Sequence, residues 1–310
     1  MDLGKRERNA GNFRTRRLLY CDYRFRVRTA KNQFFKEGDF TVLSKIVLKI
    51  TLPAAIVSSF AGKEIDIALL SLALISIGAG LVYMLVMYLI NIKRGKDAQA
   101  FEILNTAGYN IGNFTLPFVQ SFLGPMGVIT TSLFDVGNAC ICLGGAYSVA
   151  SIVKGGGKFS PLKILKALSK SVAFDCYVLM VFLTIFNLRL PAVVVSFADI
   201  IANGNAFMAM VMIGVGFKLS GDKSQIGSIV RILAVRYSIA ALIAIGCYTL
   251  LPFSLEVRQA LVILAFSPIA SAAPAFTGDM KGDVGLSSAV NSISIVCSIV
   301  IIVALLVFML

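Results

Sequence analysis

Long apolar segments separated by short polar ones make up the chain from about residue 40 onward. The last, Ser292 to Leu310, reads SISIVCSIVIIVALLVFML. About ten of its residues each favour membrane insertion by roughly 0.5 kcal/mol. A length of about 20 residues matches a hydrocarbon core about 30 Å thick. The pattern predicts an all-α polytopic membrane protein with nine spans, at residues 40–61, 65–92, 98–122, 126–153, 165–187, 191–217, 228–250, 257–279 and 284–309.

The distribution of Lys and Arg tests this count, because cytoplasmic loops collect basic residues. Nine spans place thirteen basic residues on the side of the N-terminus and three on the other side. The thirteen are Lys93, Arg94, Lys96, Lys154, Lys158, Lys163, Lys166, Lys170, Lys218, Lys223, Arg231, Arg236 and Lys281; the three are Lys63, Arg189 and Arg258. The bias predicts a cytoplasmic N-terminus and an outside C-terminus.

Composition narrows the function. The chain is 57% hydrophobic and 15% charged, whereas about 25% charged residues is usual in soluble domains. The net charge is +13, and the basic residues lie between apolar runs and in the first 40 positions. This distribution favours anionic lipid headgroups over nucleic acid as their partner. Histidine is absent, so the commonest general base and metal ligand are missing, and we expect no enzyme, metal or cofactor. The six cysteines show no disulfide or metal spacing and are interpreted as structural.

Residues 1–39 differ from the rest of the chain. They contain eleven Lys or Arg, five Asp or Glu, and no long apolar run. We interpret them as a solvated or headgroup-bound tail, with an unnatural or misread start as the alternative. The predicted organisation is this tail, a first repeat of four helices at 40–155, and a second repeat of five helices at 156–310.

Two spans carry helix breakers in their interior. The third reads LNTAGYNIGNFTLPFVQSFLGP, with Gly112 and Pro117 inside it, and the eighth reads LAFSPIASAAPAFTGDM, with Pro268 and Pro274. Proline lacks an N–H and clashes with the preceding turn, so both helices are predicted to be interrupted. Within a membrane the freed backbone groups need protein or cavity water as partners, and such breaks mark ligand or ion sites in transporters.

The spacing of the two broken spans suggests an inverted repeat. Five spans separate the third from the eighth, as two five-helix units would give if the first unit lacked its opening helix. Because five is odd, the two units would have opposite orientations. The alternative is that Pro and Gly are simply commoner in transmembrane helices.

Three elements of the sequence carry a resemblance: LSKIVLKITLPAAIVSSFAG from Leu43, NIGNFTLPFVQSFLGP from Asn110, and SPIASAAPAFTGDMKGDVGLSSAVNSIS from Ser267. In these the chain resembles the auxin efflux carrier family of the bile acid/arsenite/riboflavin transporter superfamily. The resemblance implies ten helices in two inverted five-helix repeats, in which the fourth and ninth helices unwind at prolines and cross at the substrate site. It also implies transport of organic anions, such as auxin and malate, by an elevator-type motion. The family's first helix has no apolar counterpart in residues 1–39.

The resemblance places Pro117 and Pro268 at the crossing and Asn110 in the family's asparagine position. The predicted substrate-binding set is Asn110, Gly112, Asn113, Pro117, Asn138 and Pro268. An anion would be held by backbone N–H groups at half-helix N-termini and by neutral amides, without a fixed charge in lipid. For Asn138, interhelical hydrogen bonding is the alternative.

Intramembrane acids need an explanation, because a charge at the bilayer centre costs roughly 2.5–3.5 kcal/mol. The candidates for ion or proton coupling are Asp135, Asp175 and Asp199. For Asp175 the alternative is a position near the cytoplasmic interface.

These patterns predict a secondary transporter of small organic anions such as carboxylates in the plasma membrane. The alternatives are an inactive or regulatory membrane protein from a truncated transporter, and a sodium-coupled symporter like the bile acid branch. Membrane lipids are the other expected partners. Proton or sodium coupling and homodimer formation stay open.

Overall fold

The computed structural model describes residues 39–63, 66–156, 158, 160–216 and 225–309, so nearly all of the predicted tail lies outside the described residues. Within them the chain is helical, and the only extended pairing is an isolated bridge between Tyr109 and Ile269. The predicted all-α polytopic fold is confirmed. The helices are α2 (Asp39–Ile46), α3 (Leu52–Phe60), α4 (Ser71–Ile90), α5 (Lys96–Leu104), α6 (Leu116–Cys140), α7 (Ala146–Lys154), α8 (Pro161–Leu168), α9 (Val172–Ile185), α10 (Ala192–Ala202), α11 (Asn205–Gly216), α12 (Ile226–Leu250), α13 (Leu255–Ala265), α14 (Ala273–Asp279) and α15 (Val284–Met309).

Shorter turns connect or extend several of these helices. Three are π-helical, Val47–Thr51, Ile111–Thr115 and Ile141–Gly145, and two are 3₁₀ turns, Ile67–Leu70 and Ile92–Arg94. Six helical stretches in the described residues are long and apolar enough to cross a membrane, or seven if the bent pair α8 and α9 is one span. Six is below nine for three reasons. The eighth span is divided into the short helices α13 and α14, the bent pair α8 and α9 is counted apart, and the predicted third and fourth spans fall in one stretch, Ile111–Lys154, that contains a reversal.

The reversal lies at Gly124, whose φ of 61° and ψ of −158° are not helical. Glycine accepts this left-handed region without a Cβ penalty. The chain turns there, and the second half of α6 returns to pack against α4. The predicted boundary between the spans 98–122 and 126–153 is therefore a real turn.

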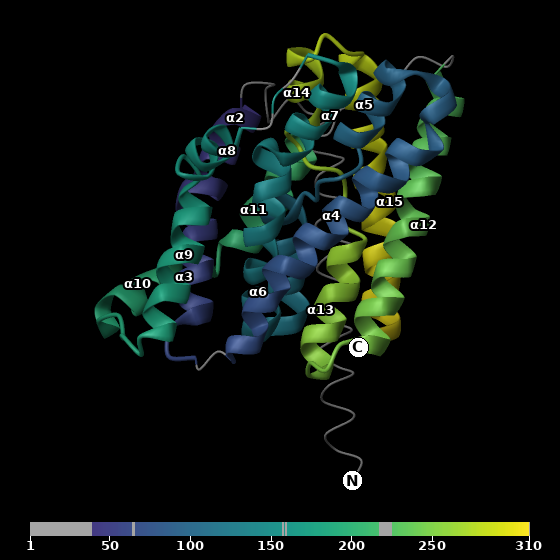
Figure 1. Cartoon of the computed structure of the whole chain (residues 1–310). Helices are drawn as coiled ribbons and strands as arrows, with labels where there is room; N and C mark the ends of the chain where they lie inside the picture. The colour runs from purple at the N-terminus through teal and green to yellow at the C-terminus, as the bar shows by residue number, and fades with distance from the viewer. Residues whose placement is uncertain (1–38, 64–65, 157, 159, 217–224, 310) are drawn as a thin grey trace, which may run out of the picture.

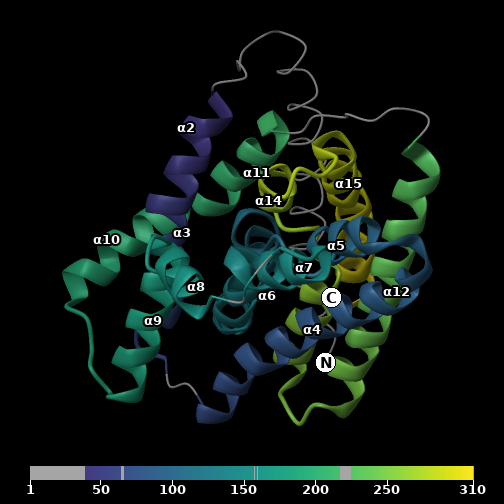
Figure 2. The same ribbon diagram turned by 45° about the horizontal axis from the view of Figure 1, so that its top comes forward.

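The helices form two groups (Figures 1 and 2). The small helix group consists of α2, α3, α9, α10 and α11, in which α3 packs against α9 and α10, and α2 against α11. The large helix group consists of α4 to α7 and α12 to α15. Helix α6 contacts α3, α9 and α11 and so joins the two groups.

The predicted fifth span, residues 165–187, is bent near its start. Helices α8 and α9 meet at an angle of 87°, so α8 points in a different direction from α9. The local cause is a new helix start, because Ser171 has extended backbone and its hydroxyl accepts a hydrogen bond from the Phe174 N–H. Lys163, Lys166 and Lys170 lie in or directly after α8.

Pro117 does not mark the break of the third span, as the sequence interpretation assumed. It lies buried in the first turn of α6, directly after the π turn Ile111–Thr115. In a regular helix its ring would clash with the carbonyl four residues before it, and the wider π turn relieves this clash. The same arrangement recurs where the π turn Val47–Thr51 precedes Pro53. Both prolines stand in a Thr-Leu-Pro sequence, so the helix absorbs each proline without breaking.

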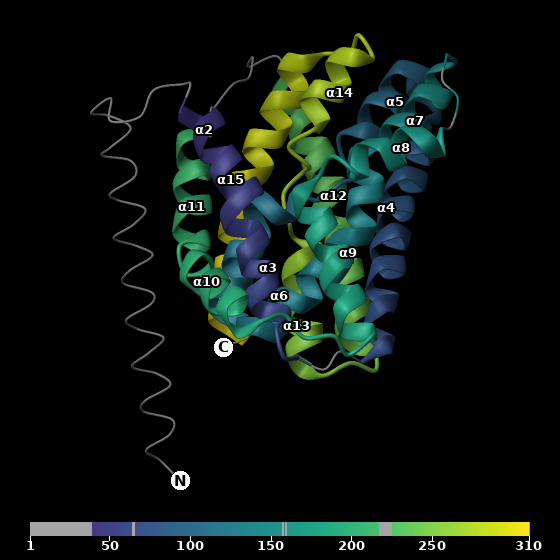
Figure 3. The ribbon, with the colours of Figure 1, turned by 90° about the vertical axis from the view of Figure 1, so that its left-hand side faces the viewer.

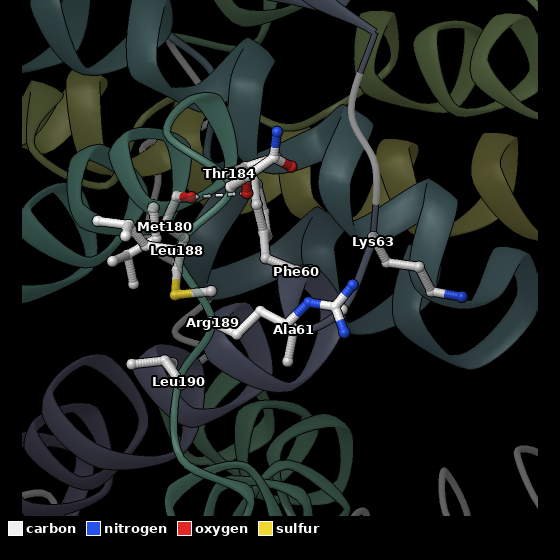
Figure 4. A pocket seen from close by; sticks show the side chains of 11 residues that line it. Phe60, Ala61, Lys63, Met180, Thr184, Leu188, Arg189 and Leu190 are labelled. Atoms are coloured by element: carbon white, nitrogen blue, oxygen red, sulfur yellow. Dashed lines mark hydrogen bonds between the residues drawn. The ribbon is translucent and has the colours of Figure 1, made fainter.

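Basic residues from separate segments of the chain meet at one end of the molecule. Arg94, Lys154, Arg231 and Lys281 line one cavity of about 430 Å³, and Figures 1 and 3 show α5, α7 and α14 together at that end. At the opposite end, Lys63 and Arg189 line a second, smaller pocket (Figure 4). The structure thus brings together residues that the span count assigned to one side.

Two of the thirteen basic residues lie within a helix long enough to cross a membrane. Arg231 and Arg236 lie inside α12. Arg231 is part of an ion cluster in which the Glu102 carboxylate, 3% exposed, contacts Arg94, Arg231 and the Asn91 amide. The sequence assignment of Arg236 to a loop is wrong, because this side chain is buried among the broken helices.

The contact between α4 and α6 leads to a stability prediction. A Cβ added to Gly137 of α6 would lie 2.0 Å from the Ala73 carbonyl oxygen of α4. We expect Gly137→Ala to separate the two helices and to cost about 1–3 kcal/mol, as overpacking typically does. A thermal unfolding curve of the detergent-solubilised protein measures this cost.

Gly78→Ala is the matched control, because Gly78 lies in α4 and a Cβ there meets nothing within 4 Å. We expect its melting temperature to be unchanged or slightly higher, since alanine favours a helix over glycine by about 1 kcal/mol. An equal loss in both variants would contradict the close backbone contact at Gly137.

Candidate functional site

Two unwound segments cross in the middle of the large helix group. The first, residues 105–110, links α5 to the π turn before α6, and the second, residues 266–272, links α13 to α14. They run antiparallel and exchange backbone hydrogen bonds, from the Asn110 N–H to the Pro268 carbonyl at 2.9 Å and from the Ala270 N–H to the Gly108 carbonyl at 3.2 Å. Each broken helix therefore supplies partners for the backbone of the other. We call residues 105–110 and 266–272 the crossing.

Side chains also join the two broken spans. The Thr115 hydroxyl donates to the Ser267 hydroxyl at 2.7 Å, on one side of the paired backbone. On the other side, the Asn105 amide donates to Thr277 of α14 at 3.1 Å and accepts from Ser287 of α15. The crossing is thus tied from α5 through to α15.

An asparagine clasps each unwound segment. The Asn138 amide of α6 accepts from the Tyr109 N–H at 3.0 Å and donates to the Tyr109 carbonyl at 2.9 Å. On the second segment, the Asn291 amide of α15 donates to the carbonyls of Ile269 and Ala270. The Ser294 hydroxyl accepts from the Ile269 N–H. These side chains satisfy backbone groups that have no helical partner.

Arg236 of α12 reaches the crossing from the side and is 1% exposed. Its guanidinium donates to the carbonyls of Thr106, Gly108, Ser267 and Pro268. The rings of Tyr83 and Tyr109 flank it, with their centroids 5.1 and 5.3 Å from the guanidinium carbon. One side chain therefore bonds both unwound segments.

Within the predicted site, the side chains of Asn110 and Asn113 have hydrogen-bonding atoms without a close partner. Among the described residues the Asn110 side chain makes no hydrogen bond, and the bonds of this residue use its backbone N–H and carbonyl. The Asn113 amide donates only a long bond of 3.4 Å to Ser271, and its carbonyl oxygen is buried without a partner. Both flank Gly112, whose added Cβ would lie 3.1 Å from Leu52 of α3 and 3.8 Å from an oxygen of Asp135. These amides therefore lie where the crossing meets the small helix group.

Asp135 lies beside this position. Its carboxylate accepts from the Asn138 amide at 2.8 Å and from the Tyr177 hydroxyl at 3.1 Å. Because Tyr177 belongs to α9, the second bond links the large helix group to the small one. Gln120 of α6 makes a similar link, since its amide donates to the Ala202 carbonyl and accepts from Asn205.

The other two acids lie away from the crossing. Asp175 is exposed in the first turn of α9. Asp199 is exposed on α10 and accepts a hydrogen bond from Ser58 of α3, within the small helix group. Of the three predicted coupling residues, Asp135 alone is joined to the crossing by hydrogen bonds in the part of the chain that the structure describes.

The sequence interpretation missed Arg236 and Asn291. An arginine ten residues inside an apolar span was a usable signal, because charges at membrane depth call for an explanation. This signal was not used because Arg236 was counted with the basic residues of the preceding loop. Asn291 lies in a segment of serines and small residues, and its role became visible only when α15 was placed against the crossing.

The clasp at Tyr109 generates a prediction. We expect Asn138→Ala to leave two backbone groups of the unwound segment without partners and to raise amide hydrogen exchange in residues 105–110 about tenfold. This change corresponds to the roughly 1–3 kcal/mol cost of an unsatisfied buried group. Hydrogen exchange with mass spectrometry on the purified protein measures the effect.

Asn203→Ala serves as the control, because Asn203 is exposed at the end of α10 and lies outside the crossing. Exchange in residues 105–110 should stay at the wild-type rate in this variant. Unchanged exchange in Asn138→Ala would show that the clasp does not hold the segment.

Comparison with known proteins adds one finding. The model of a family described as membrane transport protein matches residues 29–158, which include α2 to α7 and the first half of the crossing. The match confirms the resemblance to the auxin efflux carrier family over these residues. The search of curated proteins found no match.

Proposed function

We propose that this chain, whose residues 29–158 match the model of a family described as membrane transport protein, is a secondary transporter of small organic anions such as carboxylates. The observation that carries the proposal is the crossing, where the Asn110 side chain makes no hydrogen bond among the described residues. Beside it, Asn113 has one long bond to Ser271 and an unpaired carbonyl oxygen. Irregular backbone at membrane depth is tolerated only where it is buried in protein or lines a cavity, and transporters place their substrate there.

The polarity of the crossing favours an anionic substrate. The π turn at Ile111 and helix α6 begin directly after the first unwound segment, so their first N–H groups and the positive end of the helix dipole face it. The Asn110 amide adds a neutral donor, and the Asn113 amide would add a second one by giving up its long bond to Ser271. A carboxylate accepts hydrogen bonds from such groups without a fixed charge on the substrate-binding side chains.

We further propose an elevator-type motion of the large helix group against the small one. The polar bonds between the groups are few, chiefly those of Tyr177 to Asp135 and of Gln120 to Ala202 and Asn205. Each is a side-chain bond that can be exchanged for another, whereas the crossing is held by backbone pairing within the large group. The crossing and its substrate would therefore move as one unit.

Asp135 is the proposed site of proton coupling. Its carboxylate accepts the Tyr177 bond between the groups, so a proton on that oxygen would remove the acceptor and weaken the link. The orientation we propose has the end with Arg94, Lys154, Arg231 and Lys281 in the cytoplasm of a cell whose plasma membrane holds the protein.

Substrate binding is tested with Asn110→Ala. We expect the initial rate of labelled mono- and dicarboxylate uptake into proteoliposomes to fall about tenfold or more, since a hydrogen bond to a charged ligand contributes roughly 1.5–3 kcal/mol. Asn203→Ala, with an exposed amide outside the crossing, should transport like the wild type. A well-folded wild-type protein that moves none of the carboxylates would instead favour a membrane protein without transport activity.

Coupling is tested with Asp135→Asn, which removes the protonatable group and keeps the size of the side chain. We expect wild-type carboxylate flux to respond to an imposed pH gradient and the variant to have the same flux with and without it. Asp199→Asn is the control and should keep the wild-type response. A pH response that survives in Asp135→Asn would assign coupling to another group.

A further inference from the structure

Arg236 occupies a position in which carbonyl oxygens converge. Its guanidinium contacts the carbonyls of Thr106 and Gly108, directly after the end of α5, and those of Ser267 and Pro268, directly after the end of α13. Four oxygens from two unwound segments thus surround one cation. In transporters with broken helices, carbonyls of this kind bind the coupling sodium ion or proton.

The negative charge of two helix ends nearly equals the positive charge of Arg236. The C-terminal end of a helix carries about −0.5 elementary charge, so the ends of α5 and α13 together present about −1 to the crossing. The single positive charge of Arg236 offsets it. Among the described residues Arg236 forms no ion pair, while Arg94, Lys154 and Arg231 do. The helix ends and carbonyls, together with the flanking tyrosine rings, are therefore its counter-charge.

An arginine guanidinium is better suited to bond these four carbonyl oxygens than a lysine ammonium is. A guanidinium presents five N–H donors in a rigid plane and stays charged when buried. It can therefore bond both segments at once, as a bound metal cation would, but it cannot leave. The Tyr83 and Tyr109 rings, which meet edge to face at 5.8 Å, further hold the group in place.

From these contacts we infer that Arg236 is a built-in cation that takes the place of a coupling sodium ion at the crossing. With the two negative helix ends neutralised, the positive end of α6 is left to attract an anionic substrate. Transport then needs no metal cation. The inference deepens the proposed function and rests on it for the identity of the substrate, whereas the role of the cation can be measured without transport.

Chemical rescue provides the test. We expect Arg236→Ala to lose carboxylate uptake by about tenfold or more and to regain it when guanidinium is added well below denaturing concentrations. Urea, which has the same shape without the charge, should not restore uptake. The melting temperature of the variant should rise with guanidinium or sodium, whereas that of the wild type should not respond to sodium.

Arg258→Ala is the matched control. Arg258 also bonds a carbonyl, that of Tyr248, and lies over an aromatic ring, but it is outside the crossing. Guanidinium should neither change carboxylate uptake by Arg258→Ala nor raise the melting temperature of this variant. Arg236→Lys keeps the charge, so we expect it to fold and to retain part of the uptake even if Arg236→Ala does not fold.

Three outcomes would overturn the inference. They are wild-type uptake in Arg236→Met, equal effects of guanidinium and urea on Arg236→Ala, and a sodium-dependent rise in wild-type uptake or melting temperature. A wild-type protein that transports no carboxylate would refute the proposed function alone, because the melting experiments would still decide whether Arg236 substitutes for a cation.

Discussion

Backbone N–H and C=O groups that have no helical partner cannot face lipid, and this constraint shapes the centre of the protein. Two spans unwind there, and each leaves several such groups exposed to a medium without water. The crossing satisfies them by pairing residues 108–110 with 268–270. Asn138, Asn291 and Arg236 bond groups that the pairing leaves over. The surrounding helices of the large group can then be read as supports that place these side chains.

The same constraint explains why the site has a rigid backbone and, beside it, side chains with unpaired hydrogen-bonding atoms. Groups needed to hold the backbone are fully bonded, as the Asn138 amide is on both of its atoms. At the boundary with the small helix group, the Asn110 side chain makes no hydrogen bond among the described residues, and Asn113 has an unpaired carbonyl oxygen. In an apolar medium an unsatisfied amide is costly, so groups left open at this place favour an interpretation as a binding site. Hydrogen bonds between the two helix groups, by contrast, are side-chain bonds that a sliding motion can exchange.

The sequence correctly indicated that a proline disturbs the third span, but the break in this span does not lie at the proline. Pro117 does disturb its helix, but a single π turn absorbs the disturbance. The actual break lies a few residues earlier, at Asn105 to Asn110, where the second segment is close enough to replace the lost helical bonds. A break thus forms where partners for the backbone exist, and those partners lie more than 150 residues away along the chain.

Much of the protein follows from the sequence alone. Apolar segments of membrane length determine the all-α polytopic fold, because lipid excludes other open structures. The order of Lys and Arg predicts which loops share an end, and interior prolines and glycines show which two spans are irregular. Only the tertiary structure decided which atoms satisfy the unwound backbone. The guanidinium of Arg236, the clasp of Asn291 and the link between Asp135 and Tyr177 all join distant segments. Hydropathy and spacing describe one segment at a time, whereas each of these bonds depends on how close two segments come after packing.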